Sequence, residues 1–118
     1  MRSRLLASMG ALALALGGML VPVSPVAADP AHCYIWGTPP DRHTSGGYSF
    51  KNGTYIRRGP YMDCDGLGLG YSTHGIDVYC DAYVDGIQWV YLRDTSTGVK
   101  GWSRRDTLNW NGTSTPFC

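Results

Sequence analysis

Hydrophobic and polar residues alternate along the second half of the chain. In the segment 76–82, the apolar residues Ile76, Val78, Cys80 and Ala82 are separated by polar or aromatic side chains. A period of two residues predicts a strand with one buried face. Further short strands are predicted at 55–57, 88–92, 99–103 and 107–108, with a helical turn at 104–106. No segment has the 3.6-residue apolar stripe of a helix longer than a turn or two. The pattern therefore predicts an all-β domain of about five short strands.

Turn signals separate these strands. Asn52-Gly53 and Asp85-Gly86 are dipeptides typical of tight hairpins, and residues 94–98 form a second hairpin turn. The glycine-rich and aspartate-rich segment 59–70 is predicted as a long loop. Short strands joined by tight turns favour a small β-barrel.

The first 28 residues have the pattern of an export signal. Two arginines precede a charge-free apolar run over residues 5–21, and small residues end it at 26–28. Glycines interrupt this run, which is shorter than the ~20 apolar residues that a membrane span needs. We therefore expect cleavage before Asp29. The product would be secreted, either free outside the cell or associated with the cell wall, with no membrane contact after cleavage.

The remaining residues suffice for one small domain. We divide them into an irregular N-terminal arm at 29–53, a barrel at 54–108 and a C-terminal tail at 109–118. Within the arm, only 34–36 resembles a strand. Beyond the signal, eight basic residues face nine acidic ones, a formal charge of −1. This balance argues against nucleic acid as a partner, because phosphate binding needs a concentrated basic surface. We expect a monomer.

The four cysteines, Cys33, Cys64, Cys80 and Cys118, all follow the signal. An even number in an exported chain predicts a disulfide framework, and four cysteines allow three pairings. We favour Cys64–Cys80, which would tie the long loop to a strand, and Cys33–Cys118, which would close the chain nearly end to end. No C-x-x-C motif suggests a zinc ribbon or a thioredoxin-type site.

Other chemistry-bearing residues form no recognisable catalytic motif. The segment 63–66 resembles a calcium loop faintly, but it lacks the third acid and the closing Glu, so a plain turn is favoured. His32, His43 and His74 have no metal-ligand spacing and are expected to be solvated. The arginine doublets at 57–58 and 104–105 could meet acidic wall polymers, but they are expected to be ordinary surface. We expect no enzymatic activity, no metal and no cofactor.

Residues 54–108 resemble the SH3-like domains of bacterial exported and cell-wall proteins. The matching features are the segment 55–60 (Tyr-Ile-Arg-Arg-Gly-Pro), the strand 89–92 (Trp-Val-Tyr-Leu), and Gly101-Trp102 after a turn. Arg58 departs from the pattern, since the family more often has a small residue there. The resemblance implies a small SH3-like barrel, and it also suggests the Cys64–Cys80 pair. The arm before Thr54 is not explained by it.

Fourteen aromatic residues are more than a barrel of this size can bury, which favours a binding surface. SH3-like barrels bind extended peptides on an aromatic-lined groove, so the resemblance implies such a site here. The candidate groove residues are Tyr61, Tyr71, Trp89, Tyr91 and Trp102. Trp89 and Trp102 lie where the family has structural aromatics, so a core position is favoured for these two over the groove. We expect a non-catalytic binding module for peptide or cell-wall peptidoglycan. The alternative is a secreted effector or inhibitor of another extracellular protein, with the arm as its contact.

Overall fold

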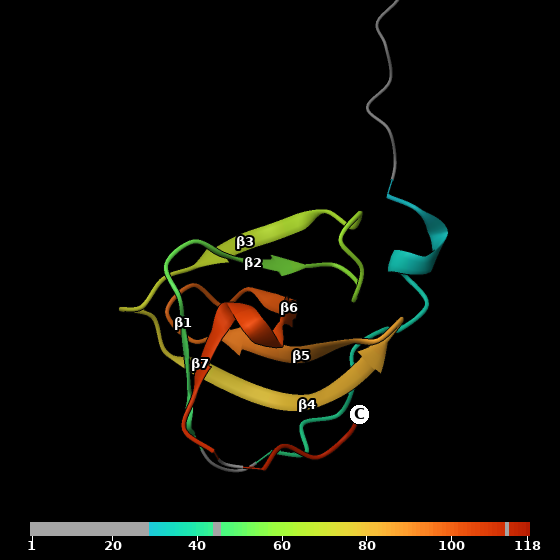
Figure 1. Cartoon of the computed structure of the whole chain (residues 1–118). Coiled ribbons are helices and arrows are strands. Elements are labelled where there is room, and N and C mark those ends of the chain that lie inside the picture. The colour runs from blue at the N-terminus through green and yellow to red at the C-terminus, as the bar shows by residue number, and fades with distance from the viewer. Residues whose placement is uncertain (1–28, 44–45, 113) are drawn as a thin grey trace, which may run out of the picture.

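The computed structural model describes residues 29–43, 46–112 and 114–118, and the predicted export signal at 1–28 lies outside them. The described chain is all-β, as expected, with two single-turn 3₁₀ helices (Figure 1). The elements are η1 (Ala31–Cys33), β1 (Tyr48–Phe50), β2 (Thr54–Arg57), β3 (Gly66–Gly70), β4 (Ile76–Val84), β5 (Ile87–Asp94), β6 (Lys100–Arg104), η2 (Arg105–Thr107) and β7 (Leu108–Trp110).

Five antiparallel strands form the main sheet in the order β3-β2-β6-β5-β4, and β1 pairs with β7 in a second, two-stranded sheet. The main sheet curls, so that the β2–β3 pair lies over β4 and β5, with β6 between them (Figure 1). Gly101 permits this curl. A Cβ atom there would collide with the carbonyl oxygen of Arg57, where β6 passes close to β2. Only glycine allows such close backbone approach.

The β4–β5 hairpin forms where the alternating pattern and the Asp-Gly dipeptide predicted it. Asp85 and Gly86 both have positive φ, 52° and 79°, as a two-residue hairpin turn of the primed type requires. Val78 and Cys80 face the interior as expected. Asp81, expected on the outer face, is also buried, because Phe117 of the tail forms a parallel bridge beside it.

Two apolar clusters form the core. One contains Phe50, Ile56, Val78, Val90, Leu92 and Leu108, which come from both sheets. The other contains Cys80, Ala82, Val84, Trp89, Tyr91 and Trp102, and Trp36 and Tyr61 pack against it. Since Phe50 is fully buried, the segment predicted as an arm enters the core before residue 54.

Three local predictions were wrong. The segment 48–50, placed in the irregular arm, forms β1, because its partner β7 lies about sixty residues away and could not be seen locally. The segment 66–70, placed in a loop, forms β3 against β2, although its glycines have low strand propensity. The segment 34–36 is not a strand, since the 3₁₀ helix η1 and a turn occupy this part of the chain.

All four cysteines form disulfides, as expected, but the favoured pairing was wrong. The bonds are Cys33–Cys64 and Cys80–Cys118, with Cα–Cα distances of 5.7 and 4.9 Å. Cys64 faces η1, so it joins the arm to the loop after β2 and is not available to Cys80. Cys80 instead joins β4 to the tail. Each bond therefore fastens one terminal segment to the barrel.

Candidate ligand-binding site

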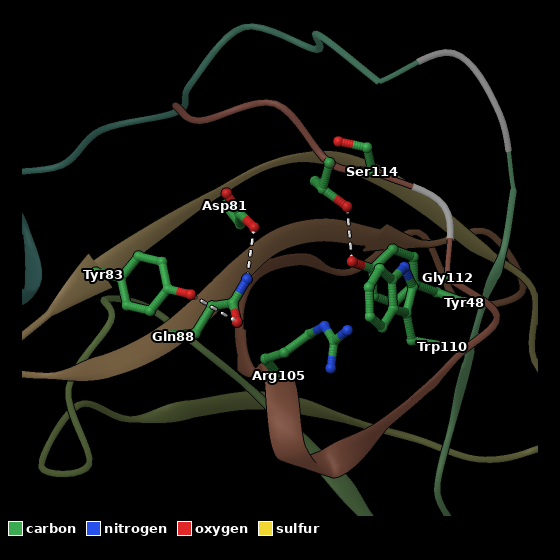
Figure 2. Close-up of a pocket in the computed structure, with 9 residues that line it drawn as sticks. Tyr48, Asp81, Tyr83, Gln88, Arg105, Trp110, Gly112 and Ser114 are labelled. Atoms are coloured by element: carbon green, nitrogen blue, oxygen red, sulfur yellow. Dashed lines mark hydrogen bonds between the residues drawn. The ribbon is translucent and has the colours of Figure 1, made fainter.

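A pocket of about 430 Å³ opens where the β4–β5 hairpin, η2 and the small β1–β7 sheet meet (Figure 2). Its principal side chains come from five different elements and are Tyr48, Asp81, Tyr83, Gln88, Arg105 and Trp110. Residues of the tail complete the wall. The pocket exists because the tail runs alongside β4, where the Cys80–Cys118 bond holds it.

Polar side chains of the hairpin form a short hydrogen-bonded chain on one wall. The Tyr83 hydroxyl donates to Gln88 Oε1 at 3.3 Å, and Gln88 Nε2 donates to Asp81 Oδ2 at 2.7 Å (Figure 2). Tyr83 and Gln88 are directly opposite each other across the antiparallel pair, which brings their side chains to the same face. These two hydrogen bonds fix the orientation of the Gln88 amide and of one carboxylate oxygen of Asp81.

The carboxyl group of Asp81, which lines the pocket, has a shifted pKa. Burial raises the pKa of Asp81, while the hydrogen bond from Gln88 and the positive charge of Arg105 lower it, and burial dominates. Its second oxygen, Oδ1, is buried and has no hydrogen-bond partner among the described residues. A buried acceptor without a donor is costly, and a ligand that supplied an N–H or O–H group would relieve that cost.

Arg105 provides the positive charge and is held by aromatic rings. Its guanidinium carbon lies 3.9 Å from the centre of the Trp110 ring and 5.7 Å from that of Tyr48. The two rings stack, with centroids 6.5 Å apart, and the Tyr48 hydroxyl lies 2.6 Å from Thr115 Oγ1. Within the described ranges, no carboxylate forms an ion pair with Arg105. The cation is thus positioned by ring contacts and remains able to bind an anion.

This arrangement suits a ligand that has a carboxylate and an N–H group close together. Arg105 can donate two N–H groups to the carboxylate in its forked geometry, and Asp81 or the Gln88 carbonyl can accept the N–H of the ligand. The rings of Tyr48 and Trp110 can cover apolar parts of the same ligand. The carboxyl end of a peptide has this combination of groups.

The five aromatic residues expected in a groove do not form one. Trp89, Tyr91 and Trp102 have only 1, 5 and 0% of their surface exposed, and they pack together in the second core cluster. Tyr61 is half-buried and contacts His32, with ring centroids 4.2 Å apart. Tyr71 is exposed, and its ring lies edge to face with His74 at a centroid distance of 5.4 Å.

The three histidines also differ from expectation, since none is a simple solvated loop residue. His43 is buried, and its ring lies edge to face with Tyr48. His74 Nδ1 donates to Asp94 Oδ2 at 2.6 Å, and Asp94 is fully buried. His32 Nε2 donates to Asp63 Oδ1 at 2.8 Å, so the carboxylate that suggested a calcium loop is paired with a histidine.

Sequence reasoning missed most residues of the pocket. Arg105 was noted only as half of an arginine doublet, and Trp110 lay beyond the predicted barrel. Tyr48 lay in a segment assigned to an irregular arm. The pocket depends on the β1–β7 pairing and on the Cys80–Cys118 bond, and neither has a local signal in the sequence.

Comparison of the chain with protein-family models, with curated proteins and with solved structures gives no significant match.

Proposed function

We propose that this protein is a secreted, non-catalytic binding module that recognises the carboxylate-bearing end of a short peptide, such as a cell-wall peptide. The proposal rests on the position and surroundings of the Arg105 guanidinium. Its guanidinium is stacked on Trp110 without an ion-pair partner in the described part of the chain, and it faces the same pocket as Asp81 and Gln88. A rigid cation beside a hydrogen-bonded carboxylate offers complementary charges to a peptide terminus.

Two disulfides are consistent with an extracellular protein, because such bonds persist mainly in oxidising compartments. Among the residues that the structure describes, no helix is both long and apolar enough to cross a membrane. The resemblance of residues 54–108 to SH3-like domains of exported proteins also supports a peptide-binding role. We place the binding surface in the pocket of Figure 2 in place of the aromatic groove first expected.

A non-catalytic role is supported by the chemistry of the pocket. Asp81 is the one acidic side chain among its described lining residues, whereas glycoside hydrolysis by the common mechanisms uses a pair of carboxylates. The nearest hydroxyls belong to Tyr48 and Tyr83 and to the tail, and no described histidine lines the pocket to act as their base. Binding is what these residues can do without further groups.

The test compares one short peptide with a free carboxyl terminus and its amidated form, using tryptophan fluorescence or calorimetry to follow binding. The free acid should bind at least about tenfold more tightly, because the amide loses the charge-assisted pair with Arg105. Arg105→Gln should remove the difference. Arg93→Gln is the matched control, since Arg93 lies on β5 outside the pocket. Equal affinity of the acid and the amide for the unaltered protein would refute the proposal.

Sedimentation with purified cell walls then tests the ligand class. The folded protein should be retained, and salt should weaken retention only modestly, because a single Arg105–carboxylate pair is involved. If the protein binds the peptide but is not retained by cell walls, the pocket still stands as a peptide-binding site and the cell wall is excluded as its ligand.

The second candidate is an effector that contacts another extracellular protein through its arm. Ile35 is 71% exposed and Tyr34 is 56% exposed, next to the disulfide that fixes the arm. Neighbouring exposed apolar residues are typical of contact surfaces. If this reading is right, Tyr34→Ala with Ile35→Ala abolishes capture of a secreted partner, while Arg105→Gln leaves that capture unchanged.

A further inference from the structure

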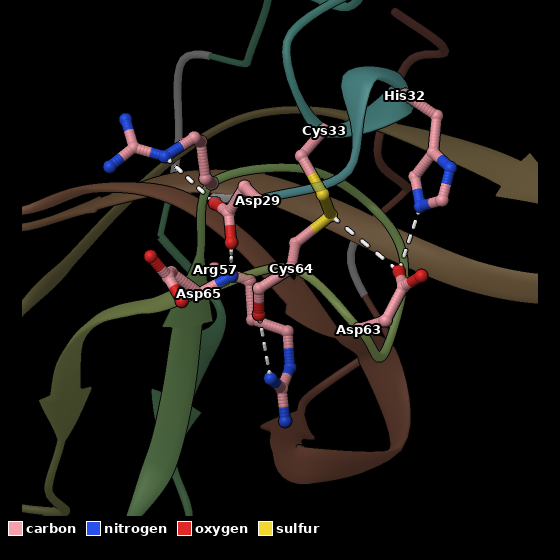
Figure 3. Close-up of a disulfide and its surroundings, with 8 residues drawn as sticks. Asp29, His32, Cys33, Arg57, Asp63, Cys64 and Asp65 are labelled. Carbon is pink, nitrogen blue, oxygen red and sulfur yellow. Dashed lines mark hydrogen bonds and ion pairs between the residues drawn. A yellow bond between two sulfur atoms is a disulfide. The ribbon is translucent and has the colours of Figure 1, made fainter. Parts of the chain in front are cut away.

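A second cluster of chemistry-bearing side chains surrounds the Cys33–Cys64 disulfide (Figure 3). His32 and Asp63 immediately precede the two cysteines, so the bond brings an imidazole and a carboxylate together as well. One potential ligand atom from each of the four residues lies within 4.8 Å of all the others. This closeness places two sulfurs, one nitrogen and one oxygen around a single point.

Among the described residues, no histidine and carboxylate gather in this way around the Cys80–Cys118 bond. In the described part of the chain, the His32 cluster is the one group of three or more metal-ligating side chains that lie this close. Its two sulfurs belong to buried residues, with 1 and 2% of the surface of Cys33 and Cys64 exposed. The side chains of His32 and Asp63 are 39 and 57% exposed. The cluster therefore has a buried sulfur side and an open side from which an ion can enter.

We propose that the reduced form of this cluster is a zinc site, with Cys33, Cys64, His32 and Asp63 as its four ligands. Two thiolates, an imidazole and a carboxylate are donors that zinc takes in tetrahedral geometry, at about 2.3 Å for sulfur and about 2.0–2.2 Å for nitrogen and oxygen. The soft sulfur pair favours zinc over calcium or magnesium. The Cα atoms of the cysteines are 5.7 Å apart, so only side-chain rotations need to separate the sulfurs.

The conversion requires a reductant, which we take to be a dithiol. Its thiolate attacks one sulfur of the bond, a mixed disulfide forms, and the second thiol of the reductant resolves it. The products are two cysteine thiols and the oxidised, cyclic form of the reductant. Zinc binding then displaces the two thiol protons to solvent. A pocket of about 300 Å³ is lined by Cys33 together with the cations Arg58 and Lys100, whose charge would attract an anionic thiolate to this side of the bond.

The consequence concerns the arm. In the oxidised protein, the disulfide is the covalent link between η1 and the loop after β2. In the reduced protein, a zinc ion held by ligands from both segments would make the same connection. The start of the arm, residues 31–33, would then stay linked to that loop under reducing conditions while zinc is present, and it would lose this link when both the bond and the metal are absent. This role is independent of the pocket at Arg105.

The test uses the full chain, reduced anaerobically with a phosphine, which does not compete strongly for zinc. Cobalt titration should give the visible absorption of a tetrahedral ion with thiolate ligands, and zinc should displace cobalt at one ion per chain. The oxidised chain should show neither signal. Circular dichroism monitors the fold throughout. A reduced chain that loses its fold, and does not regain it with zinc, overturns the proposal.

Variants separate this site from metal capture by any pair of thiols. His32→Gln and Asp63→Asn should each weaken zinc binding at least about tenfold, while their oxidised forms unfold like the unaltered protein. Cys80→Ser with Cys118→Ser should retain the cobalt spectrum, and Cys33→Ser with Cys64→Ser should lose it. Unchanged affinity in both His32→Gln and Asp63→Asn would refute the four-ligand site.

Discussion

Trp36 of the arm contacts Trp102 of β6 edge to face, with ring centroids 5.4 Å apart. Trp102 in turn contacts Tyr91, at 5.2 Å, so the three rings form one continuous cluster. The arm therefore covers aromatic residues of the barrel that would otherwise have been candidates for ligand contact. The neighbouring Cys33–Cys64 bond keeps this segment close to the barrel.

Trp36→Ala should lower the free energy of unfolding by about 2–3 kcal/mol, because it removes a large ring that packs against the second core cluster. Ile35→Ala is the matched control. Its side chain is 71% exposed, and its loss should change stability by no more than about 0.5 kcal/mol. Urea unfolding followed by circular dichroism measures both values. Equal losses for the two variants would show that the arm does not pack against the barrel.

The disulfide pairing can be tested by mapping peptides without reduction. Trypsin should release three peptides joined by two disulfides, with Cys33 and Cys118 on the outer two. Because Cys64 and Cys80 fall on one tryptic peptide, chymotryptic cleavage after Tyr71 is needed to separate them. Mass spectrometry should then find Cys33 linked to Cys64, and Cys80 linked to Cys118. A Cys64–Cys80 link would contradict the structure.

Removing either bond by paired serine substitution should cost about 4 kcal/mol. The bonded cysteines are separated by 31 and 38 residues, and the entropy of closing loops of such similar length is nearly the same. Thermal unfolding of the two double variants provides the comparison. A much larger loss for one of them would indicate that its bond also maintains native packing.

Substitution of Asp94 should lower the stability of the protein more than substitution of any other polar residue of the barrel. Its carboxylate is fully buried and accepts hydrogen bonds from His74 Nδ1 at 2.6 Å and from the backbone N–H groups of Ser96 and Thr97 at 2.8 and 3.2 Å. Asp94→Asn removes the charge and turns part of an acceptor into a donor, so it should cost about 2–4 kcal/mol.

Asp77→Asn is the control for that experiment. Asp77 is half-buried and lies 3.8 Å from Arg93, an arrangement that contributes little on a protein surface. Its substitution should change stability by at most about 0.5 kcal/mol in urea unfolding. If both asparagine variants were equally stable, the buried network at Asp94 would have no special energetic role.

Asp81 should make the protein less stable as the pH rises. Since burial raises its pKa in the folded state above the ordinary value of 3.8, the folded protein binds this proton more tightly than the unfolded chain. The destabilising effect is absent below pH 3.8, grows between that value and the folded pKa, and is complete above it. Asp81→Asn should remove this effect while its carbonyl still accepts from Gln88.

Urea unfolding at a series of pH values measures this effect as the difference in stability between the unaltered protein and Asp81→Asn. The other carboxylates titrate in both proteins, so their contributions to the free energy of unfolding largely cancel in the difference. The difference should favour the variant increasingly as the pH rises, then level off. A difference that favoured the unaltered protein at neutral pH would mean that Arg105 stabilises the Asp81 charge more than burial destabilises it.

The features that sequence reasoning predicted are those with a local cause. The alternation around Val78 and the Asp85-Gly86 turn are determined by neighbouring residues, and both are as predicted. Pairing between distant segments has no such signal. The contact of Tyr48 with Trp110 depends on two strands that meet only after the chain has folded, and the choice among three cysteine pairings depends on where the arm lies.

The same distinction explains the aromatic residues. Composition showed that a barrel of this size has more rings than it can hide, and Trp110 and Tyr83 are indeed exposed, at 45 and 61%. Periodicity could not show which rings these would be, because Trp102 is covered by Trp36, a residue of the arm that the resemblance to SH3-like domains did not explain.

The two disulfides close loops that do not overlap in sequence, since both Cys33 and Cys64 precede Cys80 and Cys118. Of the three possible pairings, this is the one in which the first two cysteines bond to each other and the last two bond to each other. In a chain exported N-terminus first, as proposed above, Cys33 and Cys64 would enter the oxidising compartment before Cys80 and Cys118. Correct bonds can thus form in the order of emergence, without later exchange between sulfurs.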